Sequence, residues 1–345
     1  MPSAADLIRA AIAANNGPIP FRQFMELALY SEAGFYSGDD NSGKAGRRGD
    51  FITSPEVGPL FGALLARMID DEWKKAGSPD QFTVVDAGAG PGTLARTILA
   101  AQPQCAHALT YIAVETSSRQ RALHPEGITS VEEMPKNIDT GVVIANELLD
   151  NLPFDLWVYD SGWRLAHVDM NGDQCVEVLH TAEVPSIFPD TAPHGTRLPW
   201  QHDAQQWLAS TLSSLRSGRV VMIDYCTALT VELIGRPYRE WLRTYVGHQR
   251  GAHYLQQPGV QDITTQVLID QLSLVREPDA VRTQAQFLAR WGIDELVDEG
   301  KRVWAEKAAR PDLEAIRMRS RVSEAEALTD PAGLGAFSVC EWAVS

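Results

Sequence analysis

The chain has 345 residues, of which 45 are acidic and 30 basic, so its formal net charge is −15 at pH 7. This length predicts one large domain with insertions or two smaller domains, and a hydrophobic content of 44% is enough for a sizeable core. The acidic balance argues against the phosphate backbone of a nucleic acid as the main partner. It suits a cationic substrate or a basic partner segment.

The beginning of the chain has an acidic residue at Asp6 and no secretory pattern, and no apolar run in the sequence is long enough to span a membrane. The four cysteines are far apart and lack the spacing of a metal site: Cys105, Cys175, Cys226 and Cys340. We therefore expect reduced thiols, no metal, no membrane span and a cytoplasmic protein.

Residues 1–80 are predicted to form an N-terminal helical segment. After a first amphipathic helix, Phe21–Tyr30 has helical apolar spacing, and a loop-rich stretch follows. Ser54 can cap a helix and Pro55 suits its first turn, so we expect one helix over Glu56–Lys75.

The stretch Thr83–Ala95 begins the predicted core, residues 81–345. A short apolar strand ends at Asp86, Gly88, Gly90 and Gly92 alternate, and a helix begins at Thr93. Glycines let the backbone approach a ligand closely, and a helix start presents free N–H groups to an anion. A dinucleotide fingerprint needs its third glycine where Thr93 stands. The observed D-x-G-x-G-x-G form is common in S-adenosylmethionine (SAM) methyltransferases; the alternative is a purely structural turn.

A second buried strand, Leu109–Val114, ends at Glu115. An acidic residue at this point of a βαβ unit holds a ribose diol, at a spacing of roughly 20 residues from the glycines. The alternative is a solvated carboxylate. The next buried strand, Gly141–Ala145, ends at Asn146 and Glu147, where cofactor and substrate should meet because open parallel sheets bind ligands beyond the carboxyl ends of their strands.

Two insertions interrupt the predicted core. Residues 154–200 alternate in short segments separated by turn residues, which is typical of β hairpins. Residues 226–261 follow a buried strand that ends at Asp224, and their length without a clear pattern suggests a lid or substrate segment.

The last part of the chain returns to regular elements. Asp262 is expected to cap a helix that begins at Ile263, and Leu272–Val275 is expected to form a sixth strand. The sequence also predicts two helices and a final strand, over Thr283–Arg290, Ile293–Lys307 and Phe337–Val344.

Several of these segments, in this order, resemble the MidA-like SAM-dependent methyltransferases, which are related to the arginine methyltransferase that assists assembly of mitochondrial complex I. The most specific of them are GDFITSPEVGPLFG at Gly49–Gly62 and ANELLDNLP at Ala145–Pro153. The others include DAGAGPGTLA, IDY, PGVQDITTQV and LTDPAGLGAFSVCEW.

This resemblance implies an α/β class I SAM methyltransferase fold: a Rossmann-like, seven-stranded sheet with an antiparallel last strand. It implies that Asp86 and the three glycines hold the methionine end of SAM and that Glu115 holds the ribose. Asn146 would line the junction with the substrate. It also implies that the segment ending in Thr53, Ser54, Pro55 and Glu56 folds over the cofactor, which would leave as S-adenosylhomocysteine (SAH).

Paired carboxylates can orient a guanidine or amine and accept its proton during methyl transfer. We expect Glu147 and Asp224 to do so, with Asp150 and His248 as further candidates. The leading hypothesis is N-methylation of an arginine in a partner protein, as the resemblance implies. Members of the family usually have Gly after IDY and an Arg-Gly-His in the second insertion, where this chain has Cys226 and Val246-Gly247-His248. These departures favour one alternative, methylation of a small molecule or modified peptide. The other alternative is a SAM-binding assembly chaperone without catalysis. Aromatic residues of the first insertion suggest a homodimer contact.

Overall fold

The computed structural model describes residues 2–37, 53–247 and 249–345, which form two compact units. The small-sheet unit consists of the described residues of Met1–Phe51 together with Leu148–Ser210 and Tyr225–Glu277. The seven-stranded unit consists of the described residues of Ile52–Glu147 together with Thr211–Asp224 and Pro278–Ser345.

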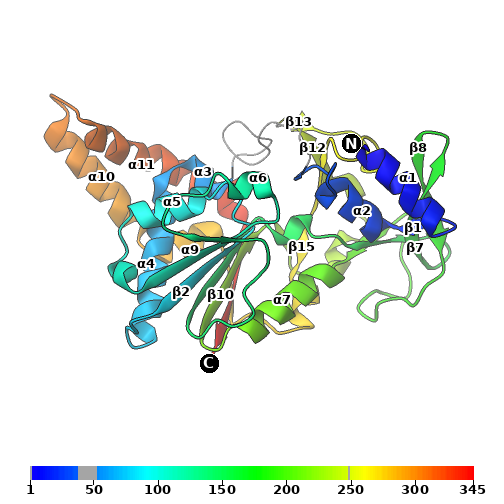
Figure 1. The fold of residues 1–345 in the computed structure, drawn as a ribbon, viewed down its shortest axis with the longest axis horizontal. Coiled ribbons are helices and arrows are strands. Elements are labelled where there is room, and N and C mark those ends of the chain that lie inside the picture. The colour runs from blue at the N-terminus through cyan, green and yellow to red at the C-terminus, as the bar shows by residue number, and fades with distance from the viewer. Residues whose placement is uncertain (1, 38–52, 248) are drawn as a thin grey trace. The chain divides into compact units, whose positions relative to one another are not determined.

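The seven-stranded unit contains a mixed sheet with the strand order β16-β17-β10-β5-β2-β3-β4, of which Figure 1 labels β2 and β10. Its strands are β2 (Phe82–Ala87), β3 (Leu109–Val114), β4 (Thr129–Val131), β5 (Gly141–Asn146), β10 (Gly218–Asp224), β16 (Ala280–Thr283) and β17 (Ser338–Val344). Strand β17 is antiparallel to both of its neighbours, whereas the pairs from β10 to β4 are all parallel. This arrangement confirms the predicted class I methyltransferase fold.

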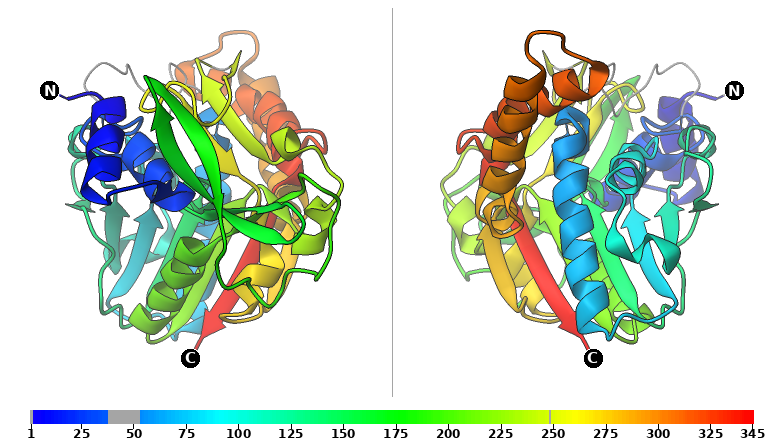
Figure 2. Two further views of the ribbon diagram at one scale, coloured as in Figure 1. Left: turned by 90° about the vertical axis from the view of Figure 1, so that its right-hand side faces the viewer. Right: turned by 90° about the vertical axis from the view of Figure 1, so that its left-hand side faces the viewer.

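The helices of this unit are α3 (Ser54–Val57), α4 (Pro59–Lys75), α5 (Thr93–Ala100), α6 (Ser118–Arg121), α9 (Gln284–Arg290), α10 (Ile293–Lys307) and α11 (Leu313–Thr329). Helix α4 lies across one face of the sheet beside α5 (Figure 2). Val84, Val85 and Val143 are fully buried, as expected of parallel strands that are covered on both faces.

The predicted helix Glu56–Lys75 is divided in two at Gly58. Its N-cap is Thr53 rather than Ser54. A side chain at Gly58 would meet the carboxyl carbon of Glu324 at 2.2 Å. That carboxylate accepts the backbone N–H of Leu60 at 2.8 Å and so caps α4 from the far end of the chain. The break at Gly58 therefore makes room for the Glu324 side chain, which accepts a hydrogen bond from a backbone N–H at the start of α4.

Two predictions near the C-terminal part of the chain were wrong. The sixth strand predicted over Leu272–Val275 is not formed, because Leu272 belongs to helix α8 (Ile269–Ser273). The seven-stranded sheet is instead completed by β16. Asp262 does not cap a helix, because Asp262–Thr265 forms strand β14. Its buried carboxylate instead accepts hydrogen bonds from Tyr36 at 3.0 Å and from the side chain of Asn151 at 3.1 Å.

The small-sheet unit contains α1 (Ala4–Ala14), α2 (Phe21–Tyr30), β1 (Ile19–Pro20), β6 (Asp155–Tyr159), β7 (Trp163–Asn171), β8 (Gln174–His180), β9 (Arg197–Trp200), β11 (Cys226–Thr227), β12 (Leu242–Val246), β13 (Gln249–Arg250), β14 and β15 (Val267–Leu268). Helix α7 (His202–Ser214) crosses from this unit into the other along the chain. The antiparallel pairs β6–β7 and β7–β8 agree with the predicted hairpins. Residues 226–261 contribute Trp241 and Tyr254 to the apolar core of this unit, against which α2 packs through Phe21.

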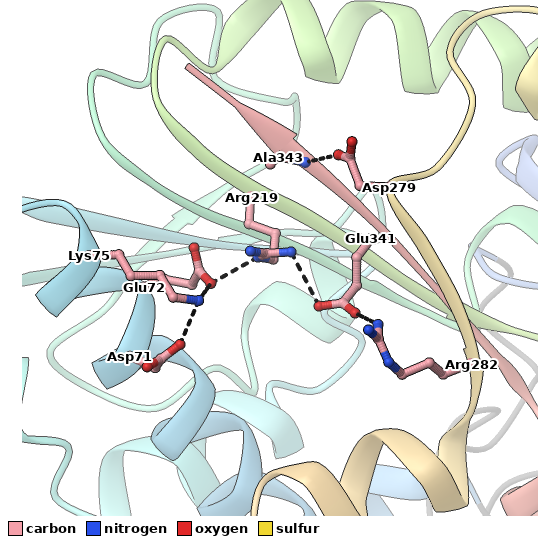
Figure 3. A network of polar contacts seen from close by, with 8 residues as sticks. All are labelled: Asp71, Glu72, Lys75, Arg219, Asp279, Arg282, Glu341 and Ala343. Atoms are coloured by element: carbon pink, nitrogen blue, oxygen red, sulfur yellow. Dashed lines mark hydrogen bonds and ion pairs between the residues drawn. The ribbon is translucent and has the colours of Figure 1, made fainter.

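A buried ion network ties the end of the sheet to α4 (Figure 3). Arg219 of β10 lies 2.9 Å from Glu72 of α4 and 3.4 Å from Glu341 of β17. Arg282 of β16 contacts the other oxygen of the Glu341 carboxylate. Glu341 and Glu72 are almost completely buried, so these cations neutralise charges that water does not reach.

No helix within the described part of the chain is both long enough and apolar enough to cross a membrane.

Candidate functional site

The glycine loop follows β2 at the carboxyl edge of the seven-stranded sheet. Gly88, Gly90 and Gly92 have φ values of 73°, 52° and 77°, a region that side chains disfavour. A Cβ atom at Gly92 would also lie 2.9 Å from Pro125. The alternation of glycines in the sequence thus corresponds to a backbone that turns left-handed three times before α5 begins. The N–H groups of Gly88 and Ala89 both donate to the carbonyl of Val114 at 3.0 Å, which holds the loop against the end of β3.

Glu115 follows β3 and contacts this loop directly. One carboxylate oxygen accepts the N–H of Gly90 at 3.0 Å, and the other accepts the N–H of Ser117 at 2.8 Å. Its carboxylate is therefore fixed beside the glycines, at the position predicted to hold a ribose.

Asp86 is the last residue but one of β2, the strand that leads into the loop, and it is almost completely buried. Burial raises the pKa of its carboxyl group from 3.8 to about 7, and the charge of Glu115 adds to this rise. The hydroxyl of Tyr111 donates to Asp86 at 3.0 Å and opposes the rise. Asp86 is thus held between its neutral and charged forms near neutral pH.

The ends of β5 and β10 bring the two preferred catalytic carboxylates onto adjacent strands. Ile223 pairs with Asn146 in the parallel register, so Asp224, the last residue of β10, lies next to Glu147, which directly follows β5. The N–H of Glu147 donates to the carbonyl of Ile223 at 2.9 Å. Asp224 is fully buried. Glu147 has a φ of 52°. This conformation costs free energy in a non-glycine residue, and residues strained in this way are often found at functional sites.

Helix α3 contacts the end of β5. The N–H of Ser54 donates to the Glu147 carboxylate at 3.4 Å, and the side chain of Asn146 donates to the same oxygen at 3.1 Å. Glu56 accepts the N–H of Thr53 at 3.5 Å in a capping box, which defines the start of α3. Pro55, between them, is buried.

The two further catalytic candidates, Asp150 and His248, are not among the residues that the structure describes at this edge of the sheet. Asp150 belongs to the small-sheet unit, where it is buried and accepts the hydroxyl of Thr264 at 2.5 Å. His248 and the first residues of the segment Gly49–Glu56 lie outside the described residues.

Two side chains at this edge were missed by the sequence analysis. A ring nitrogen of His124 lies 2.8 Å from the carbonyl of Gly90, and its other ring nitrogen lies 2.8 Å from the hydroxyl of Ser130. The hydroxyl of Ser54 donates to the buried side chain of Gln284 at 2.9 Å. His124 and Gln284 do not belong to a recognisable motif, because each contacts its partner only through the tertiary fold.

Comparisons with known proteins identify the family of this chain. A family model described as "Putative S-adenosyl-L-methionine-dependent methyltransferase" matches residues 64–285. The chain superposes with a TM-score of 0.84 on a protein from Burkholderia thailandensis that was solved bound to S-adenosyl-homocysteine. The two are 26% identical, and the match covers 99% of this chain and 91% of that one.

Curated relatives match a smaller share of the chain. The Danio rerio protein arginine methyltransferase NDUFAF7 is 26% identical over 327 residues, which cover 81% of this chain and 74% of the relative. The Drosophila melanogaster homologue is 45% identical over 98 residues, only 28% of this chain and 22% of the relative. The family model matches well over half of the chain, and the resemblance to MidA-like proteins is thereby confirmed. This chain belongs to that family of S-adenosyl-L-methionine-dependent methyltransferases.

Proposed function

We propose that this protein transfers a methyl group from SAM to the guanidinium group of an arginine in a partner protein. The pair of carboxylates at the ends of β5 and β10 carries this proposal. A guanidinium is a permanent cation with a planar set of N–H donors, and carboxylates are its natural partners. The net charge of −15 favours the approach of a basic segment, and the curated relatives bear the name of protein arginine methyltransferases.

The residues of the seven-stranded unit fit SAM. When bound, SAM supplies a methyl group on a positively charged sulfur. In this proposal the glycine loop and Asp86 receive its methionine end, and Glu115 receives the two ribose hydroxyls. The Oδ1 atom of Asn146 is buried and accepts no hydrogen bond from the described residues, so it offers a polar contact beside the loop. Helix α3 would complete the cover of the cofactor.

Glu147 and Asp224 would act on the acceptor. Methyl transfer needs the accepting nitrogen to lie in line with the bond that breaks, so orientation is the main catalytic contribution. Two strand-end carboxylates can hold a guanidinium from two sides, and one of them can take the proton that the methylated nitrogen loses. We assign the proton to Glu147, because Asn146 and the backbone of α3 hold its carboxylate in place.

The experiment is transfer of tritium from methyl-labelled SAM into a cell lysate that is then separated into protein and small-molecule fractions. Label in protein that depends on the enzyme supports the proposal. Label confined to metabolites would instead assign a small-molecule acceptor. Binding of SAM without transfer into either fraction would identify a non-catalytic assembly chaperone.

A further inference from the structure

The small-sheet unit contains a pocket of about 230 Å³ beside β12 and β13. Figure 1 labels these two strands. It is formed within the segment 226–261 and belongs wholly to that unit. Its lining includes three arginines and three rings: Arg239, Arg243, Arg250, Tyr238, His253 and Tyr254. The concentration of positive charge contrasts with the acidic character of the whole chain.

None of the three arginines has an acidic partner among the residues that the structure describes. Arg239 contacts the hydroxyl oxygen of Tyr238 at 3.3 Å. Arg243 and Arg250 donate to the backbone carbonyls of Glu240 and Arg239, each at 2.7 Å. These contacts hold the guanidinium groups in place but neutralise none of their charge.

Two acidic side chains near the pocket are engaged by other cations. Glu240 lies 3.6 Å from Arg236. Glu177 accepts two hydrogen bonds from Arg197, both at 2.8 Å, and a third from the hydroxyl of Tyr254 at 2.7 Å. These two carboxylates therefore do not offset the charge of the three lining arginines.

His253 adds a neutral donor to the lining. Its Nδ1 atom accepts the N–H of Leu255 at 3.3 Å, which leaves the proton on Nε2. Burial lowers the pKa of His253, and the charges of Arg197 and Arg239 lower it further, against an opposing effect of Glu177.

We propose that this pocket binds an oxyanion group, a carboxylate or a phosphate, carried by a small ligand or an acidic peptide. Arginine side chains bind such groups through paired N–H donors, and the volume is below the common range of roughly 300–1,000 Å³ for drug-sized ligands. The pocket thus suits one anionic group with a small body. The inference does not depend on the identity of the methyl acceptor.

The test uses the full-length protein and calorimetric titration at low salt with two probes, inorganic phosphate and a short glutamate-rich peptide. The wild type is expected to bind at least one probe. The double variant Arg239→Gln/Arg250→Gln changes two exposed residues and should weaken that affinity about tenfold or more. Arg164→Gln is the matched control, because it removes the same charge from the same unit outside this lining.

Binding of phosphate alone would identify a phosphate-bearing ligand, and binding of the peptide alone would identify acidic side chains. Absence of binding to both probes, or equal affinity in the double variant, would overturn the proposal. A second measurement needs no variant: phosphate or peptide should shift the ring resonances of His253 in the wild-type protein. Unchanged resonances at saturating probe would also overturn it.

Discussion

The carboxylate of Glu115 accepts the backbone N–H of Gly90 at 3.0 Å, which joins the end of β3 to the glycine loop that follows β2. This contact places Glu115, which we propose binds the ribose, beside the loop that we propose binds the methionine end of SAM. Two backbone N–H groups donate to this carboxylate, and its remaining lone pairs are available to a diol.

Glu115→Gln should weaken SAH binding about tenfold to 100-fold, because hydrogen bonds to a charged acceptor are worth about 1.5–3 kcal/mol. Calorimetric titration with SAH measures the effect. Glu132→Gln is the matched control, since it changes an exposed glutamate that pairs with Arg121 near the same edge. Equal affinity in Glu115→Gln and Glu132→Gln would remove Glu115 from the cofactor site.

Glu147→Gln should preserve SAH binding and lower turnover about 100-fold, the contribution typical of a positioned general base. Glutamine keeps the size and the hydrogen bond from Asn146 but cannot take a proton from the acceptor. Single-turnover rates with labelled SAM, measured beside the SAH dissociation constant, separate the two effects. Unchanged turnover would exclude Glu147 from the chemistry.

Asp86 should make stability depend on pH. Its folded-state pKa of about 7 lies above the ordinary value of 3.8, so the folded protein binds the proton more tightly than the unfolded chain. The free energy of unfolding therefore falls as pH rises from about 4 to about 7. Asp86→Asn removes this contribution. Between about pH 5.5 and about pH 8, the variant should gain on the order of 2 kcal/mol relative to the wild type.

Urea denaturation of both proteins at several pH values measures this difference. Parallel stability curves across the range would show that Asp86 does not titrate between the two pH values.

Glu341→Gln should lower the free energy of unfolding by about 3 kcal/mol, because it leaves the guanidinium groups of Arg219 and Arg282 without their shared buried carboxylate. Asp139→Asn is the control. It removes the partner of Arg216 from an exposed pair, and such pairs contribute about 0–1 kcal/mol. Equal losses in the two variants would mean that burial of the network adds nothing.

The sequence predicted the parts of the fold that local chemistry determines. The alternating glycines required positive φ values, and the apolar runs of β2, β3, β5 and β10 required burial. The carboxyl ends of these strands then carried Asp86, Glu115 and Glu147 to one edge of the sheet. These predictions rest on the residues themselves and on the order of parallel strands.

Other elements depend on partners that are distant in the chain. Helix α11 was not predicted, because its buried residues are only Ala315, Glu324 and Leu328 and its apolar spacing is weak. One of them, Glu324, caps α4 across the fold. Asp262 lies in a strand, and its carboxylate accepts hydrogen bonds from Tyr36 and Asn151. Nothing in its local sequence distinguishes that role from a helix cap.

The most direct test of the proposed activity is the identity of the methylated residue. The purified protein is incubated with methyl-labelled SAM and lysate protein, and the labelled protein is hydrolysed to amino acids and separated. We predict label in methylarginine that is lost with Glu147→Gln. Label in any other residue, or in small molecules alone, would contradict arginine methylation.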